Sequence, residues 1–224
     1  TNIYIQKGEL KGFIKKIEKK AYDMGIRVEY VDKKYIEKFA ENTAHQGVMA
    51  KMPSFGYSSV DEMIIYAKKI NEDPFLIILD EITDPHNLGS IIRTAEVAGC
   101  HGVIIPKHRA CEVNATAIKT SAGAVFNIKI ARVTNITTTI NYLKEHNIWI
   151  YGACGEASQT HTQANLKGPI GLVIGNEGKG ISRLVRENCD QLIKIPMYGK
   201  TESLNASNAA SILIYEIIRQ RYEK

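Results

Sequence analysis

Residues 75–99 read FLIILDEITDPHNLGSIIRTAEVAG, and this segment decides the fold because it joins an apolar strand to an amphipathic helix. Its first five residues are all apolar, as expected of a strand that is buried on both faces of a parallel sheet. From Asn87 to Ala98 the apolar residues recur at helical spacing, and Gly99 follows at the natural stop position of a helix. A buried strand followed by a covering helix predicts one unit of an α/β domain.

The same alternation continues toward the end of the chain. We predict further strands at residues 103–105, 128–130, 148–151, 171–174 and 192–195. We predict further helices at residues 114–122, 136–145 and 203–221. Strands that are separated by helices indicate an α/β fold with a mostly parallel sheet and helices on both faces.

The first part of the chain is richer in lysine and has shorter apolar runs. We predict strands at residues 3–5, 28–31 and 48–50, and an amphipathic helix from Lys11 to Tyr22. These elements indicate a small α/β domain over residues 1–57, a linker with a helix over residues 58–73, and a larger domain over residues 74–224. The chain starts directly with a strand-like run, so we expect that residues upstream of Thr1 are missing.

Composition narrows the class of protein. The chain has 224 residues, 44% of them hydrophobic, and a net charge of +5. No apolar run approaches the roughly 20 residues of a membrane helix, and no signal peptide opens the chain. The cysteines form no CxxC pair, so we expect no metal site, and free thiols fit a cytoplasmic protein. The mild basicity fits a phosphate-rich partner, although it fits many other proteins almost as well.

Three polar segments follow predicted strands, where ligands bind in open parallel sheets. In the first, Asn87 is expected to cap the helix that follows, and Arg93, six residues later, is expected to point to a similar side. The planar guanidinium of an arginine in such a place can hold a phosphate. Taken alone, the pattern fits a capped helix with a surface arginine better than it fits a binding site.

The second segment, residues 175–180, reads GNEGKG and is neither GxGxxG nor a P-loop. Its glycines allow a ligand to approach the backbone, and Glu177 could bind a hydroxyl, an amine or an arginine. The third segment contains Ile-Pro-Met at residues 195–197 and a helix start that is rich in Ser and Asn at residues 203–208. Each could also be purely structural, as a tight turn or as a polar helix start.

Together the three segments resemble the SpoU (TrmH-like) family of RNA 2′-O-methyltransferases, which belongs to the SPOUT superfamily. The first family motif, N-x-G-x-x-x-R-T-A, is matched by Asn87, Gly89, Arg93, Thr94 and Ala95. The second, G-x-E-x-x-G-[IL]-S, is matched by Gly175, Glu177, Gly180, Ile181 and Ser182. The third, I-P-M followed by S-L-N-x-S, is matched by Ile195, Pro196, Met197, Ser203, Leu204, Asn205 and Ser207. The segment Lys119 to Ala124 is similar to the family's stretch between the first two motifs. With all these segments, the resemblance extends from Phe75 to the end, about two thirds of the chain.

The resemblance implies a fold, a cofactor and partners. We expect a C-terminal trefoil knot, a homodimer with each active site near the dimer interface, S-adenosylmethionine as cofactor, and structured RNA as substrate. Residues 45–48, His-Gln-Gly-Val, resemble the end of an N-terminal substrate-binding domain of this family, whose first strand and helix are absent here. This layout is similar to the subgroup that methylates a guanosine of large-subunit (23S) ribosomal RNA.

The resemblance also implies roles for individual residues. The cofactor-binding residues are expected to be Gly175, Ile195, Leu204, Thr120, Gly152, Asn176 and Met197. The catalytic residues are expected to be Arg93, Asn87, Glu177, Ser203 and Asn205. Arg93 is the residue usually proposed to activate the 2′-hydroxyl. Since a neutral arginine is hard to obtain, we expect it instead to orient the ribose and to stabilise the developing alkoxide.

Other functions stay open at this point. A transfer-RNA methyltransferase, an antibiotic-resistance methyltransferase and a non-catalytic RNA-binding module could share these motifs. A nucleotide-dependent oxidoreductase would need GxGxxG after the first long strand, where this chain has DPHNLG at residues 84–89. In the N-terminal part, Lys11, Lys15 and Lys19 could contact RNA phosphates, or could simply form a solvated helix face.

Overall fold

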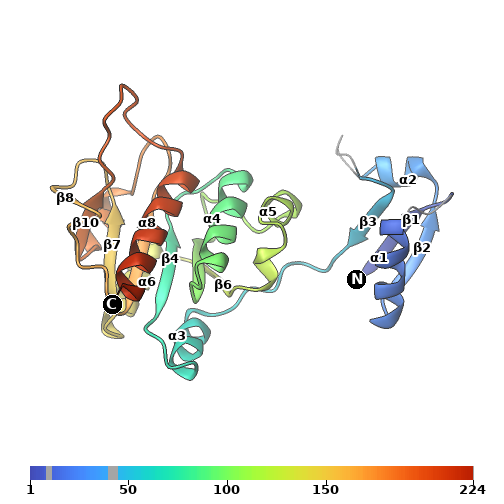
Figure 1. The fold of residues 1–224 in the computed structure, drawn as a ribbon, viewed down its shortest axis with the longest axis horizontal. Coiled ribbons are helices and arrows are strands. Elements are labelled where there is room, and N and C mark those ends of the chain that lie inside the picture. Colours follow the sequence, from blue (N-terminus) through green and yellow to red (C-terminus); the bar gives the residue numbers. More distant parts are fainter. Residues whose placement is uncertain (9–11, 40–44, 224) are drawn as a thin grey trace. The chain divides into compact units, whose positions relative to one another are not determined.

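The computed structural model describes residues 1–8, 12–39 and 45–223 (Figure 1). The chain divides into two compact units, Thr1–Gly56 and Tyr57–Lys224. Lys11, which the sequence placed at the start of a helix, lies outside the described residues.

In its described residues, the first unit consists of a three-stranded sheet and two helices. Its elements are β1 (Asn2–Gln6), α1 (Gly12–Asp23), β2 (Arg27–Val31), α2 (Lys33–Glu37) and β3 (Val48–Lys51). The strand order is β2-β1-β3, with β1 parallel to β2 and antiparallel to β3. Ile5, Ile14 and Ile36 are buried and attach the helices to the sheet. The predicted strands and α1 are present, whereas α2 was not predicted because five residues are too few to show helical periodicity.

The second unit is built on a sheet of seven strands in the order β6-β5-β4-β9-β7-β10-β8, in which all paired strands are parallel. The strands are β4 (Phe75–Leu79), β5 (Gly102–Pro106), β6 (Ile130–Val133), β7 (Trp149–Ala153), β8 (Gln159–Thr160), β9 (Ile170–Ile174) and β10 (Gln191–Lys194). The helices are α3 (Val60–Lys69), α4 (Pro85–Val97), α5 (Ala115–Thr120), α6 (Ile136–Glu145), α7 (Arg183–Asn188) and α8 (Ala206–Tyr222), with a 3₁₀ turn, η1, at Ala124–Phe126. The predicted α/β class and the mostly parallel sheet are confirmed.

Helices cover both faces of this sheet, as the alternating side chains of β4 demonstrate. Leu76 and Ile78 pack in one apolar cluster with buried residues of α3 and α6, such as Met63 and Ile140. Phe75 points to the opposite face, where the guanidinium of Arg221 from α8 lies 4.9 Å from its ring centre. Helix α8 packs beside α4 on that face (Figure 1). All five residues of β4 are buried, which explains why the sequence predicted this strand so clearly.

Several predicted boundaries differ from the structure by one to three residues, as three examples show. Strand β6 begins at Ile130 and runs to Val133, two to three residues later than predicted, because its pairing with β5 extends through the polar Arg132. Helix α4 begins at Pro85 rather than at Asn87. Helix α8 begins at Ala206, so residues 203–205 lie in the loop before it.

Candidate active site

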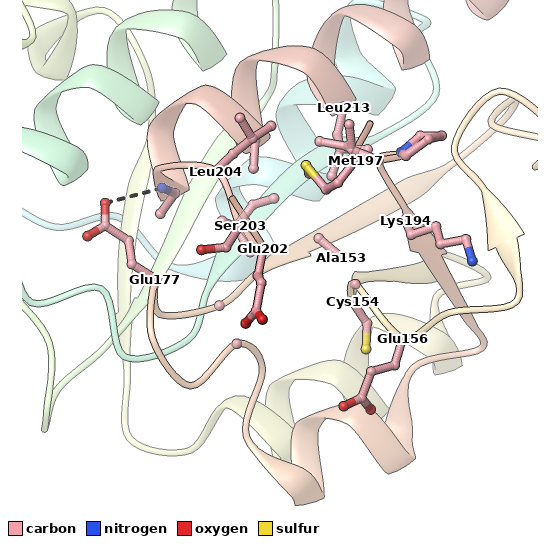
Figure 2. A pocket seen from close by; sticks show the side chains of 18 of the residues that line it. Ala153, Cys154, Glu156, Glu177, Lys194, Met197, Glu202, Ser203, Leu204 and Leu213 are labelled. Atoms are coloured by element: carbon pink, nitrogen blue, oxygen red, sulfur yellow. Dashed lines mark hydrogen bonds between the residues drawn. The ribbon is translucent and has the colours of Figure 1, made fainter. Parts of the chain in front are cut away.

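A pocket of about 820 Å³ lies at the carboxyl ends of three neighbouring strands, β9, β7 and β10 (Figure 2). The last residues of the three strands, the segments that follow them and the N-terminal half of α8 form its walls. They are Ala153, Cys154, Gly155, Glu156, Ile174, Gly175, Asn176, Glu177, Gly180, Ile193, Lys194, Ile195, Pro196, Met197, Gly199, Lys200, Thr201, Glu202, Ser203, Leu204, Ala206, Ala209 and Leu213. Parallel α/β sheets bind ligands at this edge, and the volume lies within the usual range of about 300–1,000 Å³ for a small-molecule site.

The pocket combines an apolar wall with charged and polar groups. Met197, Leu204 and Leu213 lie on one side of it, while the carboxylates of Glu156 and Glu202 lie elsewhere on its rim (Figure 2). Among the residues that the sequence predicted as ligand-binding, those that line the pocket are Gly175, Asn176, Glu177, Ile195, Met197, Ser203 and Leu204. These residues come from two separate segments of the chain, which the fold brings to one cavity.

The glycine segment forms a compact loop between β9 and α7. The residues Asn176 and Gly180 form a pair of backbone hydrogen bonds, at 3.1 Å and 2.8 Å, that close the loop. A Cβ atom on Gly175 would lie only 2.2 Å from the carbonyl carbon of Gly180, so only glycine fits at this position. Gly180 has a φ of +66°, in the left-handed region that favours glycine.

Two residues directly after β4 hold this loop from outside. The buried carboxylate of Asp80 accepts a hydrogen bond of 2.7 Å from the backbone N–H of Ser182, where α7 starts. The side chain of Asn176 donates at 3.1 Å to the backbone carbonyl of Glu81. The loop is therefore fixed at both ends by the neighbouring strand. Asp80 was not predicted as a site residue, although its place directly after a buried strand was the available signal.

A hydrogen-bonded triad joins the three motifs. The carboxylate of Glu177 accepts from the Nδ2 of Asn87 at 2.8 Å, from the Nδ2 of Asn205, and from the backbone N–H of Ala206 at 3.3 Å. Asn205 also donates to the Oδ1 of Asn87 at 2.9 Å. Three donors to one carboxylate fix the position of the Glu177 side chain. Asn87, Glu177 and Asn205, for which the family resemblance implies a catalytic role, thus lie within hydrogen-bond distance of one another.

Asn205, rather than Ser203, caps helix α8. Its Oδ1 accepts from the backbone N–H groups of Ser207 at 2.9 Å and Asn208 at 3.3 Å, and from the hydroxyl of Ser207 at 2.6 Å. The same side chain therefore caps the helix with its oxygen and contacts Glu177 with its nitrogen. Ser203 precedes the helix and lines the pocket.

The prediction that Asn87 caps α4 is wrong. Asp84 is the N-cap, since its Oδ1 accepts from the backbone N–H of His86 at 3.1 Å, and Pro85 occupies the first helical position. A proline is favoured there because it has no N–H that needs a partner. Asn87 therefore lies within the first turn and is buried, which frees its side chain for Glu177.

Arg93 lies apart from the other catalytic candidates. It is exposed on α4, whereas Asn87 is buried, so the expectation that the two share a side is wrong. Six residues correspond to about 1.7 turns, which places the two side chains well apart around the helix. Arg93 is not among the residues that line the pocket, and it forms no ion pair within residues 1–8, 12–39 and 45–223.

Thr120 and Gly152 also lie outside the pocket wall. Thr120 ends α5, where its hydroxyl lies 3.4 Å from the Nδ1 of His86. Gly152 lies in β7, immediately before the lining residue Ala153, and a Cβ on it would be 2.9 Å from the sulfur of Cys189. Burial raises the pKa of Cys189 to about 12, so this neighbour of the pocket is an uncharged thiol.

The described residues meet the requirements of neither a metal site nor a membrane-spanning helix. They include no group of three or more His, Cys, Asp and Glu side chains that could hold a metal ion. No helix among them has the length and apolar character that crossing a membrane requires.

The fold and the site define a class: an α/β enzyme domain that holds a small ligand at the carboxyl edge of a parallel sheet. The chain belongs to the SpoU rRNA methylase family, which residues 74–215 match. Residues 1–58 match the family described as RNA 2′-O ribose methyltransferase substrate binding. The chain is accordingly an RNA ribose 2′-O-methyltransferase, and S-adenosylmethionine is the methyl donor of its family.

Named relatives agree with this family. The 23S rRNA (guanosine-2′-O-)-methyltransferase RlmB of Photorhabdus laumondii is 41% identical over 220 residues, which cover 98% of this chain and 89% of the relative. The RlmB of Haemophilus influenzae is 41% identical over 223 residues, again 98% and 89% of the two chains. Among solved structures, the SpoU methyltransferase AviRb of Streptomyces viridochromogenes, in complex with AdoMet, gives a TM-score of 0.82 at 26% identity, with 100% of this chain and 83% of that chain covered.

Proposed function

We propose that this chain transfers a methyl group from S-adenosylmethionine to the 2′-hydroxyl of a guanosine in 23S ribosomal RNA. The observation that carries the proposal is the convergence of the glycine loop and the segment 195–204 on one pocket, next to the triad of Glu177, Asn87 and Asn205. The choice of target is supported by the two RlmB relatives, which match nearly the whole chain.

The residues around the pocket fit S-adenosylmethionine, which would supply the reactive methyl group. Gly175 lines the cavity, and because the backbone of Gly180 and Ile181 occupies the position of its missing side chain, the glycine lets the loop close tightly at the pocket wall. Ile195, Met197 and Leu204 offer an apolar surface to the adenine ring or to the hydrocarbon part of the methionine chain of the cofactor. Ser203 offers a polar side chain at the same cavity, and Asn176, which also lines it, shapes the loop through its hydrogen bonds to Glu81 and Gly180. Gly152, which directly precedes the lining residue Ala153, would support this site through its packing against Cys189, and Thr120 would contribute from the end of α5.

Glu177 and Asn205 are proposed to position the ribose. Their hydrogen bonds fix both side chains at the pocket edge, so they need little reorganisation when the substrate arrives. Asn87 would hold Glu177 in place, since it donates to the same carboxylate oxygen. Positioning of this kind can supply a large part of the rate enhancement, on the order of 7–11 kcal/mol in favourable cases.

Arg93 is proposed to act from a second copy of the chain. Val97, which follows Arg93 by four residues on α4, and Ile212 and Tyr215 on the neighbouring α8 are exposed apolar side chains. The two helices are joined by a contact of 3.1 Å between the hydroxyls of Thr94 and Ser211. A homodimer formed through these helices would cover these side chains and carry Arg93 of one subunit to the pocket of its partner. There its guanidinium would orient the ribose and its phosphate and stabilise the developing alkoxide.

The path of the C-terminal segment supports a trefoil knot. Strand β10 pairs with β7, yet Asn205 contacts the loop after β9, and α8 packs on β9 and α4. Residues 195–205 therefore run across the end of the sheet, which supports a knotted C-terminal segment.

We assign substrate binding to residues 1–57 and catalysis to residues 74–224, joined by the linker at residues 58–73, in a cytoplasmic protein.

The direct test is methylation of a 23S rRNA transcript by the purified chain with S-adenosylmethionine. We expect a single 2′-O-methylguanosine, located by nuclease digestion and mass spectrometry. A transfer-RNA transcript serves as the competing substrate. Methylation of the transfer RNA alone would exclude the proposed target, and methylation of neither RNA would contradict the proposed activity.

A further inference from the structure

Helix α2 and the turn after it carry two exposed aromatic rings that the fold of the first unit does not need to bury. Tyr35 is 41% exposed and Phe39 is 55% exposed. Their ring centres lie 5.4 Å apart, so the two rings form one continuous surface. Exposed aromatic pairs of this kind are favourable contact surfaces because a rigid ring loses little conformational freedom when it binds.

Buried residues of the first unit support the aromatic pair. Tyr4 in β1 is buried, and its ring centre lies 5.4 Å from that of Tyr35. Ile36, between the two aromatic residues in sequence, is fully buried and attaches α2 to the sheet. The two rings are therefore fixed by packing on the side that faces the sheet, and their other side is exposed to solvent.

Lysines accompany the rings on the same short helix. Lys33, Lys34 and Lys38 are all exposed, and only Lys33 is paired, with Glu37 at 3.1 Å. Within the described part of the chain, Lys34 and Lys38 form no ion pair. Positive charges beside exposed rings are the combination by which proteins hold single-stranded nucleic acid, with the rings stacking on bases and the lysines contacting phosphates.

The charge of the whole chain is concentrated in this unit. Residues 1–56 contain 11 Lys and Arg against 7 Asp and Glu, whereas residues 57–224 contain 18 against 17. An attractive potential for phosphates therefore comes mainly from the first unit. This asymmetry favours RNA over a protein partner as the molecule that covers the aromatic pair.

We propose that Tyr35 and Phe39 stack on unpaired bases of the substrate RNA while Lys34 and Lys38 contact the adjoining phosphates. The inference rests on the proposed function and specifies it: the substrate must present an unpaired loop or bulge to the first unit, as well as the target ribose to the second. Fully paired RNA would hide the base faces and lose this contact.

The test of stacking compares Phe39→Ala with Tyr22→Ala in the full chain. Tyr22 is the matched control, because it is an aromatic residue of the same unit and is 85% exposed on α1. We expect Phe39→Ala to raise the KM for a 23S rRNA transcript about fivefold or more, with kcat and the Kd for S-adenosylmethionine unchanged. Phe39→Trp, which keeps a ring for stacking, should restore the KM, and Tyr22→Ala should leave it unchanged.

The test of the phosphate contacts needs no aromatic substitution and so covers the case in which Phe39→Ala misfolds. We expect Lys34→Ala/Lys38→Ala to make the dependence of log Kd on log salt less steep by about 1.4 for a single-stranded oligoribonucleotide. Lys16→Ala/Lys20→Ala, two exposed lysines of α1 at the same spacing in the chain, is the matched control and should leave this slope unchanged.

Three results would overturn the proposal. One is an equal effect of both lysine pairs, which indicates diffuse attraction. Another is an unchanged KM for Phe39→Ala in a folded protein. The third is a Phe39→Ala variant whose sedimentation coefficient changes while its KM for RNA does not. Such a result would assign the rings to a contact with another protein chain. Absence of methylation by the wild-type chain would instead contradict the proposed function.

Discussion

The carboxylate of Glu177 and the side-chain amide of Asn87 are joined by a hydrogen bond of 2.8 Å although 90 residues separate them in sequence. Asn205 donates to both, so one interaction network connects the first turn of α4, the loop after β9 and the start of α8. Each motif alone was weak in the sequence, where it could have been a cap, a turn or a polar helix start. Their joint presence at one edge of the sheet is what gives them a common function.

Glu177→Ala should reduce both activity and stability. Asn87 would lose the acceptor of its buried amide, which costs on the order of 1–3 kcal/mol. We expect a lower melting temperature, measured by circular dichroism, and a loss of kcat of tenfold or more in a methylation assay. Glu187→Ala on α7, an exposed glutamate paired only with Arg183, should change neither quantity. Equal behaviour of the two variants would remove Glu177 from the site.

Gly175→Ala should disrupt the cofactor pocket, because the added Cβ would lie 2.2 Å from one backbone atom of Gly180 and 2.3 Å from the nitrogen of Ile181. The loop must shift, so we expect binding of S-adenosylmethionine to be lost in isothermal titration calorimetry. Gly178→Ala in the same loop is the matched control, since the nearest atom to its Cβ is 3.7 Å away. Intact binding by Gly175→Ala would mean that the cofactor does not depend on this loop geometry.

Asp80→Ala should weaken cofactor binding without contact to the cofactor. Ser182 would lose the acceptor that fixes the start of α7, and the loop before it would gain freedom. We expect the Kd for S-adenosylmethionine to rise about tenfold, which corresponds to about 1.4 kcal/mol. Asp80→Asn keeps an oxygen that can accept the same hydrogen bond and should bind nearly as the wild type does. If the two variants bind equally poorly, the charge of Asp80 matters rather than its hydrogen bond.

Much of this fold was predictable from apolar patterns, and the exceptions have physical causes. Strand β4 has five buried residues in succession and was predicted without error. Strand β6 was displaced because Arg132 pairs with β5 in a position that looks polar in sequence. The sequence of Asp84 and Pro85 did contain the true start of α4, as an N-cap followed by a proline at the first helical position.

The site was predictable only in part. Residues that contact the pocket through backbone or apolar atoms, such as Gly175 and Leu204, were found through motifs. Asp80 was missed because its role is a hydrogen bond to Ser182, which lies 102 residues away and is brought close only by the pairing of β4 with β9. A single sequence carries no periodic signal for such a contact.

His101 should make the stability of the second unit depend on pH. It is buried, and its Nδ1 accepts a hydrogen bond of 3.0 Å from the backbone N–H of Phe75, which requires the neutral ring. Burial lowers the pKa of His101 below its ordinary value of 6.5, an effect that the nearby Glu72 only partly opposes. The unfolded chain then binds the proton more readily, so stability is complete above pH 6.5 and is lost as the pH falls toward the folded pKa.

The measurement is the melting temperature between pH 7.5 and pH 5. We expect His101→Asn to flatten the decline over this range, because its amide oxygen can accept from Phe75 and does not titrate. His108→Asn, an exposed histidine of the loop after β5, should leave the slope as it is in the wild type. An unchanged slope in His101→Asn would show that another group is responsible.

Arg93 provides the test of the proposed dimer. We expect Arg93→Ala to abolish methylation while leaving S-adenosylmethionine binding intact, since Arg93 does not line the pocket of its own subunit. Co-expression of Arg93→Ala with Glu177→Gln should restore activity, because a mixed dimer combines an intact Glu177 on one subunit with an intact Arg93 on the other. Random pairing of the two chains gives roughly a quarter of the wild-type number of complete sites. If Arg93 serves its own subunit, every site in the mixture contains one defect, and the co-expressed pair stays as inactive as either variant alone.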